Sequence, residues 1–149
     1  MKLKQISIFI ENSPGRLYEA THALGKNGIN LRALSLVDTA GYGVLRLLVS
    51  DVVAARRIMM EKQFPARIDD VLAAEIEDKP DSLAQVLKPL LDANVNVEYM
   101  YAFTGFSSEK AVMIFRFNDN DKAIKILGKN GTRLLDTEAF GMFDGPGNH

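Results

Sequence analysis

The spacing of hydrophobic residues alternates along the chain between the two-residue period of strands and the 3.6-residue period of helices. Apolar residues crowd positions 3–10, as in a central strand. A Glu-Asn-Ser-Pro-Gly loop follows, and then a helix over 14–27 with one apolar stripe made of Leu17, Ala20, Thr21 and Leu24. We expect Ser13 to cap this helix, with Pro14 at its first position and Gly28 as its stop.

A hairpin and a second helix come next. Segments 29–37 and 44–49 are rich in Val and Leu, and turn residues separate them. Asp51 is placed to cap a helix whose apolar face carries Val52, Ala55, Ile58 and Met59. Phe64-Pro65 ends this pattern, and a short strand can follow. The predicted order is therefore β-α-β-β-α-β.

The same order returns sixty-six residues later, as an internal repeat. The loop segment 11–17 matches 77–83, and Ile29-Asn30-Leu31 falls on Val95-Asn96-Val97 without a gap. The preserved distance between these segments shows that loop, helix length and following strand recur together. We therefore predict an α+β protein built from two βαββαβ units.

The second copy differs from the first at three points. Residues 117–119 match 49–51 at a distance of sixty-eight, so the second hairpin is two residues longer. Pro89 lies inside the repeated helix, where we expect it to kink or shorten that helix. Asp81 replaces Gly15, which makes a special backbone dihedral less available in the second loop.

Three segments follow from the repeat. We place a first domain at 1–68, a second at 69–140 and a flexible tail at 141–149, where a Gly-Pro-Gly breaker occurs. The stretch 66–77 must carry the end of one sheet and the start of the next, since no Gly/Ser linker separates the copies. We expect the two halves to pack together.

Composition narrows the possible chemistry. Hydrophobic residues make up 47% of the 149 residues and charged residues 25%, with a formal net charge of -1 and no cysteine. Disulfides and thiolate metal sites are excluded, and two histidines offer little material for another metal site. No nucleophile triad, glycine-rich phosphate loop or paired acid and base is visible, so we expect no enzyme, no metal and no cofactor.

Partners and location follow from the same features. The near-neutral charge disfavours nucleic acid, and no apolar run approaches the roughly 20 residues of a membrane span. The first residues lack the long apolar region of a signal peptide. We therefore expect a cytoplasmic protein without a nucleic-acid or membrane partner.

The loop Asn12-x-Pro14-Gly15-x-Leu17, followed by Gly28-Ile29-Asn30-Leu31, resembles the ACT domain, a regulatory module of amino-acid metabolism. The second half resembles it through Asp78-x-Pro80 and Val95-Asn96-Val97, so the chain looks like a tandem ACT protein. The resemblance implies two ferredoxin-like units, each an antiparallel sheet with helices on one face, packed side by side. It further implies that an amino acid binds at the interface between ACT units, near the first strand-helix loop.

The ligand positions that the resemblance implies form two sets. The first is Asn12, Ser13, Pro14, Gly15, Arg16, Leu17, Asn30 and Leu31. The possible second site is Asp78, Pro80, Asp81 and Asn96. Unsatisfied N–H groups at a helix start favour a carboxylate, and Asn amides both donate and accept, which suits a zwitterion. Asp78 repels a carboxylate, so the two sites should differ, and we favour the first.

Plainer interpretations remain open for these residues. Asn12 and Ser13 also suit an ordinary turn and cap, and Asn30 and Asn96 suit solvated positions after a helix stop. Two sets of alternating aromatic or sulfur-containing residues could form a base-stacking platform, although a packed sheet face is favoured because no basic cluster surrounds them. These sets are Met113, Phe115 and Phe117, and Tyr99, Tyr101 and Phe103.

The leading function predicted from the sequence is an amino-acid-binding regulatory or sensor protein, expected to be a homodimer. The first alternative is a ligand-free dimerisation or interaction module that regulates a partner metabolic enzyme. A nucleic-acid-binding ferredoxin-like domain is less favoured, and a small enzyme of the same fold less still.

Overall fold

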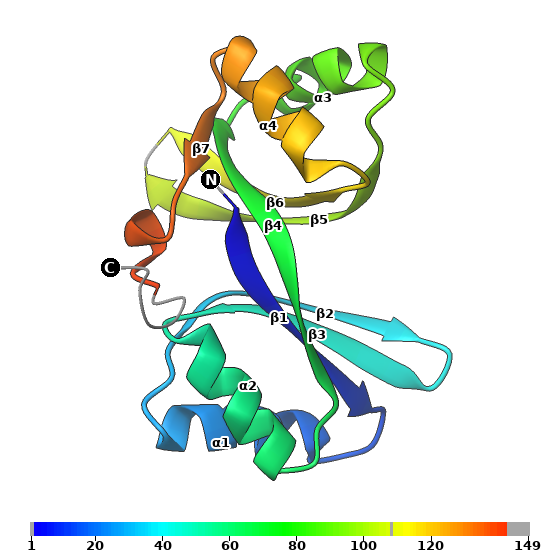
Figure 1. Cartoon of the computed structure of the whole chain (residues 1–149), viewed down its shortest axis with the longest axis vertical. Coiled ribbons are helices and arrows are strands. Elements are labelled where there is room, and N and C mark those ends of the chain that lie inside the picture. Colours follow the sequence, from blue (N-terminus) through cyan, green and yellow to red (C-terminus); the bar gives the residue numbers. More distant parts are fainter. Residues whose placement is uncertain (1, 108, 143–149) are drawn as a thin grey trace. The chain divides into compact units, whose positions relative to one another are not determined.

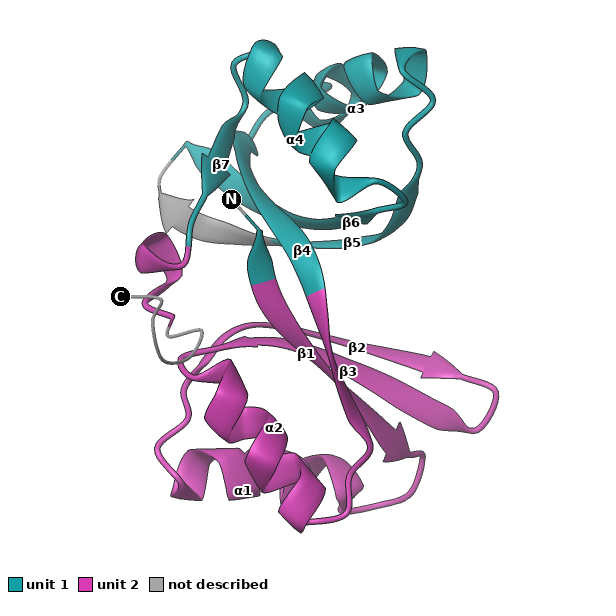
Figure 2. Ribbon diagram, in the orientation of Figure 1, with its two compact units in different colours: residues 1–3, 70–136 teal, residues 4–69, 137–149 magenta. Residues whose placement is uncertain are grey.

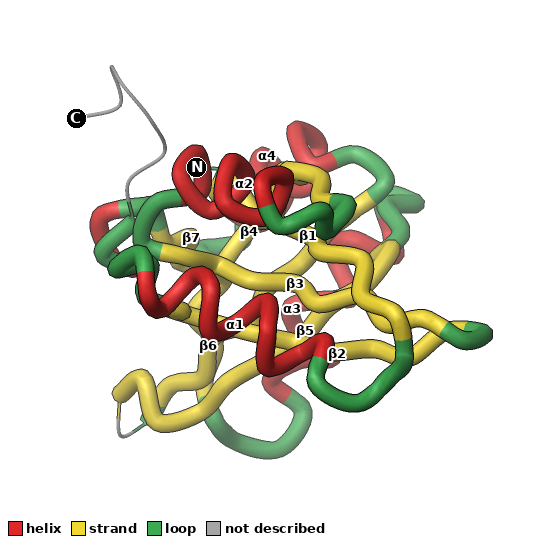
Figure 3. The backbone as a smooth tube through the Cα atoms, turned by 90° about the horizontal axis from the view of Figure 1, so that it is seen from below, coloured by secondary structure: helices red, strands yellow, loops and turns green. Residues whose placement is uncertain are grey.

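A computed structural model describes the backbone of residues 2–107 and 109–142, and their side chains except those of 103–107. The predicted tail, 141–149, lies outside the described residues from position 143 onward. Strands and helices follow the order that the hydrophobic periods predict (Figures 1 and 3). Their bounds are β1 Leu3–Glu11, α1 Arg16–Lys26, β2 Leu31–Thr39, β3 Tyr42–Val49, α2 Val52–Glu61, β4 Ala66–Glu77, α3 Ser82–Asp92, β5 Val97–Ser107, β6 Lys110–Phe117, α4 Asn120–Lys129, β7 Arg133–Leu135 and a 3-10 turn, η1 Glu138–Phe140.

The chain divides into two compact units, coloured separately in Figure 2. Of the described residues, unit 1 holds 2–3, 70–107 and 109–136, and unit 2 holds 4–69 and 137–142. Strand β4 contributes to both, because its residues 66–69 belong to unit 2 and the rest to unit 1. One long strand thus closes the first β-α-β-β-α-β order and opens the second, which explains the absence of a linker.

Unit 2 has the strand order β2-β3-β1-β4. Its β1–β3 and β2–β3 pairs are antiparallel, with Ile6 opposite Leu47 and Leu36 opposite Leu45. Helices α1 and α2 lie on one face of this sheet (Figure 1). The core between helices and sheet is aliphatic, with one aromatic ring, and is formed mainly by Ile6, Ile8, Ile10, Leu24, Leu45, Leu47, Val52, Ile58, Met59 and Phe64.

Unit 1 repeats this arrangement as β5-β6-β4-β7. Antiparallel pairing places Leu72 opposite Phe115 and Ala74 opposite Leu134. Helices α3 and α4 lie on one face of this sheet (Figure 1). Its core is formed mainly by Leu72, Ile76, Leu90, Val95, Met113, Phe115, Phe117, Ala123 and Leu127. The expected α+β fold with antiparallel sheets and helices on one face is confirmed.

All four long helices end in the same way. A residue with positive φ follows the C-cap, and the next N–H bonds back to a carbonyl of the last turn, as in a Schellman motif. In α1 the positive-φ residue is Gly28 (φ 77°), and the Ile29 N–H donates to the Leu24 carbonyl at 3.0 Å. The corresponding residues are Gln63, Asn94 and Gly131. The predicted stop at Gly28 and the predicted cap at Asp51, whose side chain accepts from the Ala54 N–H at 3.0 Å, are both confirmed.

The expected cap at Ser13 is wrong. Helix α1 begins at Arg16, and Gly15 occupies the N-cap position with φ 87° and no side-chain cap. The Arg16 N–H instead donates to the Ser13 carbonyl at 3.4 Å. Pro followed by a positive-φ Gly is the signature of a type II turn, and this turn takes the positions that the cap would have used.

The second copy departs from expectation in the backbone of Asp81 and in the length of α3. Asp81 adopts φ 71°, so it keeps the left-handed conformation of Gly15, which Asp tolerates better than most residues. Helix α3 is 11 residues long, as is α1, so Pro89 does not shorten it. Burial of Leu90, 1% exposed, holds the helix on its sheet despite the hydrogen bond that proline cannot make.

The aromatic residues do not form one platform. Register places Met100 opposite Phe115 and Tyr101 opposite Ile114, so the two sets face opposite sides of the sheet. Phe115 and Phe117 are buried in the unit 1 core, together with Met113. The packed interpretation holds for these three, whereas the side chain of Phe103 lies outside the described residues.

Candidate functional site

The residues predicted for the first site fall into two groups, one in the β1–α1 loop and one at the start of β2. The loop residues Asn12, Ser13, Pro14 and Gly15 are exposed. The Asn12 N–H donates to the Gly41 carbonyl at 3.4 Å, which joins the loop to the β2–β3 turn. Among the described residues, the Asn12 side-chain amide makes no hydrogen bond, so it is available to a ligand.

Arg16 is turned toward the body of unit 2. Its Cζ lies 4.1 Å from the centre of the Phe64 ring, and its Nη1 forms an ion pair with Glu19. Its Nε is buried without a hydrogen-bond partner among the described residues. This arrangement anchors the start of α1 and neutralises the guanidinium. Leu17, the next residue, is 41% exposed.

The Asn30 backbone joins the start of β2 to the residue that follows β3. The Asn30 N–H donates to Ser50 Oγ at 2.9 Å, and the Ser50 N–H donates back to the Asn30 carbonyl at 2.9 Å. Leu31, which begins the strand, is half-buried. The Asn30 side chain is exposed, and among the described residues its amide makes no hydrogen bond.

The second copy reproduces this backbone arrangement. The Asn96 N–H donates to Asn118 Oδ1 at 3.0 Å, and the Asp78 N–H donates to the Glu109 carbonyl at 3.0 Å. Asp78, Pro80, Asp81 and Asn96 are all exposed. The Asp81 carboxylate accepts from Gln85 Nε2 at 3.4 Å.

Strand register separates the two groups of the first site within unit 2. Glu11, next to Asn12, lies opposite Tyr42 at one end of β3, whereas Leu31 lies opposite Val49 at the other end. The intervening length of β3 corresponds to about 24 Å, taking about 3.4 Å per residue. The structure therefore does not bring Asn12 and Asn30 of one unit together, and a ligand can touch both only if different units supply them.

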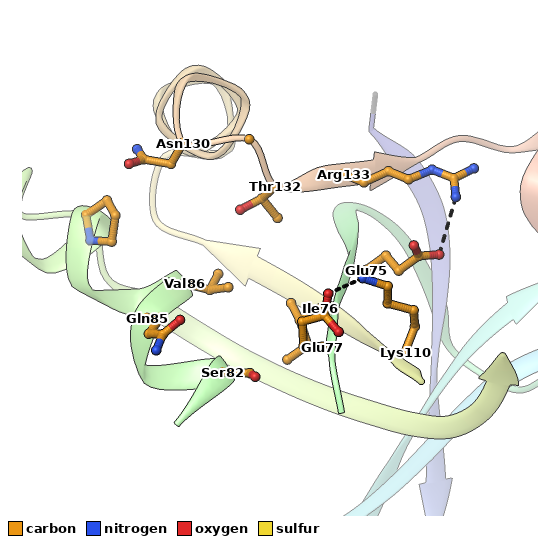
Figure 4. A pocket seen from close by; sticks show the side chains of 12 residues that line it. Glu75, Ile76, Glu77, Ser82, Gln85, Val86, Lys110, Asn130, Thr132 and Arg133 are labelled. Carbon is orange, nitrogen blue, oxygen red and sulfur yellow. Dashed lines mark hydrogen bonds and ion pairs between the residues drawn. The ribbon is translucent and has the colours of Figure 1, made fainter. Parts of the chain in front are cut away.

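A cavity lies beside the β1–α1 loop of unit 2, and another lies beside the equivalent β4–α3 loop of unit 1. In unit 2 it has a volume of about 340 Å³ and is lined by Phe9, Ile10, Glu11, Arg16, Tyr42, Gln63 and Pro65. In unit 1 it has about 400 Å³ and is lined by Glu75, Ile76, Glu77, Ser82, Gln85, Val86, Pro89, Lys110, Asn130, Gly131, Thr132 and Arg133 (Figure 4). The unit 1 cavity touches none of the residues predicted for the second site.

Sequence reasoning missed this unit 1 cavity. The repeat alignment contained a signal for it, because Arg16 and Phe64 correspond to the smaller Ser82 and Thr132. Two side chains that stack on each other in unit 2 are thus replaced by two that cannot fill the same space.

The charged side chains at the unit 1 cavity form two ion pairs. Lys110 Nζ pairs with Glu77, and Arg133 Nη1 lies 3.4 Å from Glu75 Oε2. Hydrogen bonding to Lys110, reinforced by its charge, lowers the pKa of Glu77 below its usual range. The same hydrogen bond raises the pKa of Lys110. The cavity wall therefore carries two carboxyl side chains and two basic side chains in pairs.

The described part of the chain lacks two kinds of feature. Residues 2–107 and 109–142 hold no group of three or more His, Cys, Asp or Glu side chains able to bind a metal ion. No helix in those residues is long and apolar enough to cross a membrane.

Comparison with known proteins identifies the family. The profile of the ACT domain pair matches residues 1–141. The crystal structure of a protein from Bacteroides thetaiotaomicron is 36% identical with a TM-score of 0.89, covering 96% of this chain and 98% of that one. A search of curated protein sequences gave no match.

More distant structures share the fold. The ligand-free regulatory subunit of aspartate kinase from Thermus thermophilus is 16% identical with a TM-score of 0.61, covering 85% of this chain and 91% of that one. Escherichia coli aspartokinase III in complex with aspartate and ADP is 13% identical with a TM-score of 0.55, covering 87% of this chain and 32% of that one. From the doubled β-α-β-β-α-β order and the match over 1–141, we conclude that the chain belongs to the family of ACT domain pairs.

Proposed function

We propose that this ACT domain pair is a non-catalytic regulatory protein that binds an amino acid at the β1–α1 loop of unit 2. The observation that carries the proposal is the uncapped start of α1. No side chain caps this helix, so N–H groups of its first turn are available to a carboxylate. The exposed Asn12 amide beside them can both donate and accept, as a zwitterion requires.

The structural neighbours support a regulatory role by analogy. One is the regulatory subunit of an aspartate kinase, and another is an aspartokinase in complex with aspartate and ADP. At these identities the likeness concerns the fold, and fold alone does not fix function. The analogy favours a protein that reports amino-acid levels to a metabolic enzyme.

The second wall of the site comes, in this proposal, from a second copy of the chain. Strand β2 ends the unit 2 sheet and exposes apolar side chains, with Leu34 61% and Leu36 51% exposed. Such an edge is suited to pairing with another strand. An antiparallel pair of β2 strands places the start of one strand beside the end of the other. Asn30 of one copy then lies at the same sheet end as Asn12 of its neighbour.

The same exposed edge also suits a dimerisation module that binds no ligand, so the experiment must separate the two functions. We would screen the protein against the twenty amino acids by thermal shift, and repeat any hit with Asn12→Ala, Asn30→Ala and the matched control Asn96→Ala. A ligand that binds only the folded protein raises its melting temperature by mass action. We expect the shift to be lost in the first two variants and kept in the control.

Mixing the variants tests whether two copies share the site. A heterodimer of Asn12→Ala and Asn30→Ala chains contains one site with both asparagines and one site with neither. Binding should therefore return after the two inactive variants are mixed and allowed to exchange. Each heterodimer should bind at half the stoichiometry of the native dimer. After random exchange half of the dimers are heterodimers, so the whole mixture should bind at a quarter of the native stoichiometry. Absence of a shift with any amino acid would reject the sensor and favour the dimerisation module. Salt-dependent binding of RNA would favour the nucleic-acid alternative.

A further inference from the structure

The cavities beside the β1–α1 loop of unit 2 and the equivalent loop of unit 1 occupy the same place in the repeat. Each of the seven residues that line the unit 2 cavity has an equivalent among those that line the unit 1 cavity. The registers agree, because Glu11 lies opposite Tyr42 in unit 2 and Glu77 lies opposite Lys110 in unit 1. Differences between the cavities therefore come from side chains on a common backbone frame.

One pair of exchanges distinguishes the unit 1 cavity. In unit 2 the Arg16 guanidinium stacks on the Phe64 ring at 4.1 Å and stands between the cavity beside the loop and a second cavity of about 450 Å³ along α1, which Glu19, Ala23 and Phe64 also line. Ser82 and Thr132 stand at these positions in unit 1. The cavity there extends along α3, where Gln85, Val86 and Pro89 also line it.

Ser82 contributes a hydroxyl without a partner. The residue is 6% exposed, and its Oγ is buried with no hydrogen bond among the described residues. In Figure 4 this hydroxyl lies at the start of α3, on the side that faces β4. A buried polar atom left unpaired destabilises the empty cavity, so a ligand atom that pairs with it gains affinity. The first turn of α3 also lacks a side-chain cap.

The opposite wall carries balanced charge. Glu75 and Glu77 on β4 face Arg133 and Lys110 across the two dashed contacts in Figure 4. The Arg133 side chain is 69% exposed although Glu75 is 13% exposed, so the Arg133 end of this ion pair can exchange partners. An ammonium can pair with the carboxylates and a carboxylate with the cations, whereas a ligand of one sign would leave like charges facing it. The apolar side chains of Ile76 and Val86 can hold a short aliphatic group.

We propose that the unit 1 cavity, between α3, the end of β4 and the segment after α4, is a second binding site that takes a small zwitterion of the size of an α-amino acid. It differs in place and composition from the loop site of unit 2. It also differs from the loop positions Asp78, Pro80, Asp81 and Asn96, none of which lines it. The two sites can therefore be tested independently.

The test uses backbone amide chemical shifts of the full chain, titrated with each of the twenty amino acids in turn. A ligand in the cavity should shift the amides of Ser82, Gly131 and Thr132, whereas a ligand at the loop site should shift those around Gly15. The blocking variant is Ser82→Arg with Thr132→Phe, because it restores the stacked pair that divides the equivalent space in unit 2 into two cavities. We expect it to weaken cavity binding at least about tenfold, a change of about 1.4 kcal/mol.

A second variant keeps the test decisive if the blocking variant does not fold. Glu77→Gln with Lys110→Gln removes one partner for each end of the zwitterion, at side chains that are 48% and 35% exposed. Lys88→Gln with Asp92→Asn is its matched control, since it removes an exposed ion pair from α3 outside the cavity. We expect at least about tenfold weaker binding in the first and an unchanged affinity in the second.

The outcomes separate the two proposals. Cavity shifts that survive Asn12→Ala and disappear in the cavity variants support the second site. Shifts confined to the loop of unit 2 overturn the second site and support the loop site. Cavity shifts with none at the loop support the second site and overturn the loop site. Absence of shifts with all twenty amino acids overturns both.

Discussion

Replacement of Phe64 by Ala tests whether this ring holds the start of α1 onto the core of unit 2. Phe64 is 3% exposed and belongs to that core, and Arg16 stacks on its ring. Truncating a buried Phe typically costs about 3 to 5 kcal/mol through lost transfer energy and the cavity left behind. About 0.5 to 1 kcal/mol of the loss should come from the cation–π contact. The matched control is Thr132→Ala at the equivalent, half-buried position of unit 1, which should cost less than about 1 kcal/mol.

The assay is urea unfolding of the native protein and both variants, followed by circular dichroism. Because the two units can unfold in separate steps, hydrogen exchange read on peptides should locate each transition. Phe64→Ala should lower protection in β1 and α1 and leave β6 and α4 near their native values. A free energy of unfolding within about 1 kcal/mol of that of Thr132→Ala would refute the anchoring argument.

Three further predictions concern caps, backbone and charge. Asp51→Ala and Asp119→Ala should each lower the free energy of unfolding by about 1 kcal/mol in urea titrations, because each carboxylate accepts from the backbone N–H three residues on at 3.0 Å. Gly15→Ala should cost about 1 to 2 kcal/mol in the same assay, a backbone effect alone, since φ is 87° and a Cβ would meet no atom within 4 Å. The pKa of Glu77 is lowered in the folded protein, so its stabilisation is present above its unfolded pKa of about 4.3 and is lost as the pH falls through the folded value. The pKa of Lys110 is raised, so its stabilisation is present below its unfolded pKa of about 10.4 and is lost as the pH rises through the folded value. Glu77→Gln should therefore flatten both limbs of melting temperature against pH, and unchanged limbs would contradict the pairing.

The order of elements could be predicted from the sequence because burial periods are local. The apolar stripe of α1 and the apolar run of β1 each show their own period. The internal repeat then allowed each element predicted in the first half to be predicted again in the second. Local signals also competed at one point. Ser13-Pro14-Gly15 satisfies both a helix cap and a type II turn, and only the dihedral of Gly15 shows that the turn prevails.

The arrangement of the site could not be predicted, because it depends on strand register and on paired side-chain volumes. Asn12 and Asn30 belong to the same sequence motif, but they lie beside opposite ends of β3. This separation follows only from the pairing of strand residues. Likewise Ser82 and Thr132 are distant in sequence, and the space they leave becomes visible only when α3 and the segment after α4 enclose it. A pattern of polar and apolar residues does not specify the volumes of side chains that meet in the folded protein.

The repeat explains how one backbone frame supports two different sites. Both units share three backbone features. The residue before α1 and before α3 has positive φ, and a backbone hydrogen bond closes the end of each long helix. The backbone of Asn30 bonds to Ser50, as the backbone of Asn96 bonds to Asn118. These features depend on main-chain geometry, which tolerates Asp in place of Gly at position 81. The side chains that line the cavities are not constrained by this main-chain geometry. A ligand that binds either unit therefore contacts the same backbone scaffold but different side chains. Because those side chains differ in charge and size, we expect the two sites to differ in affinity.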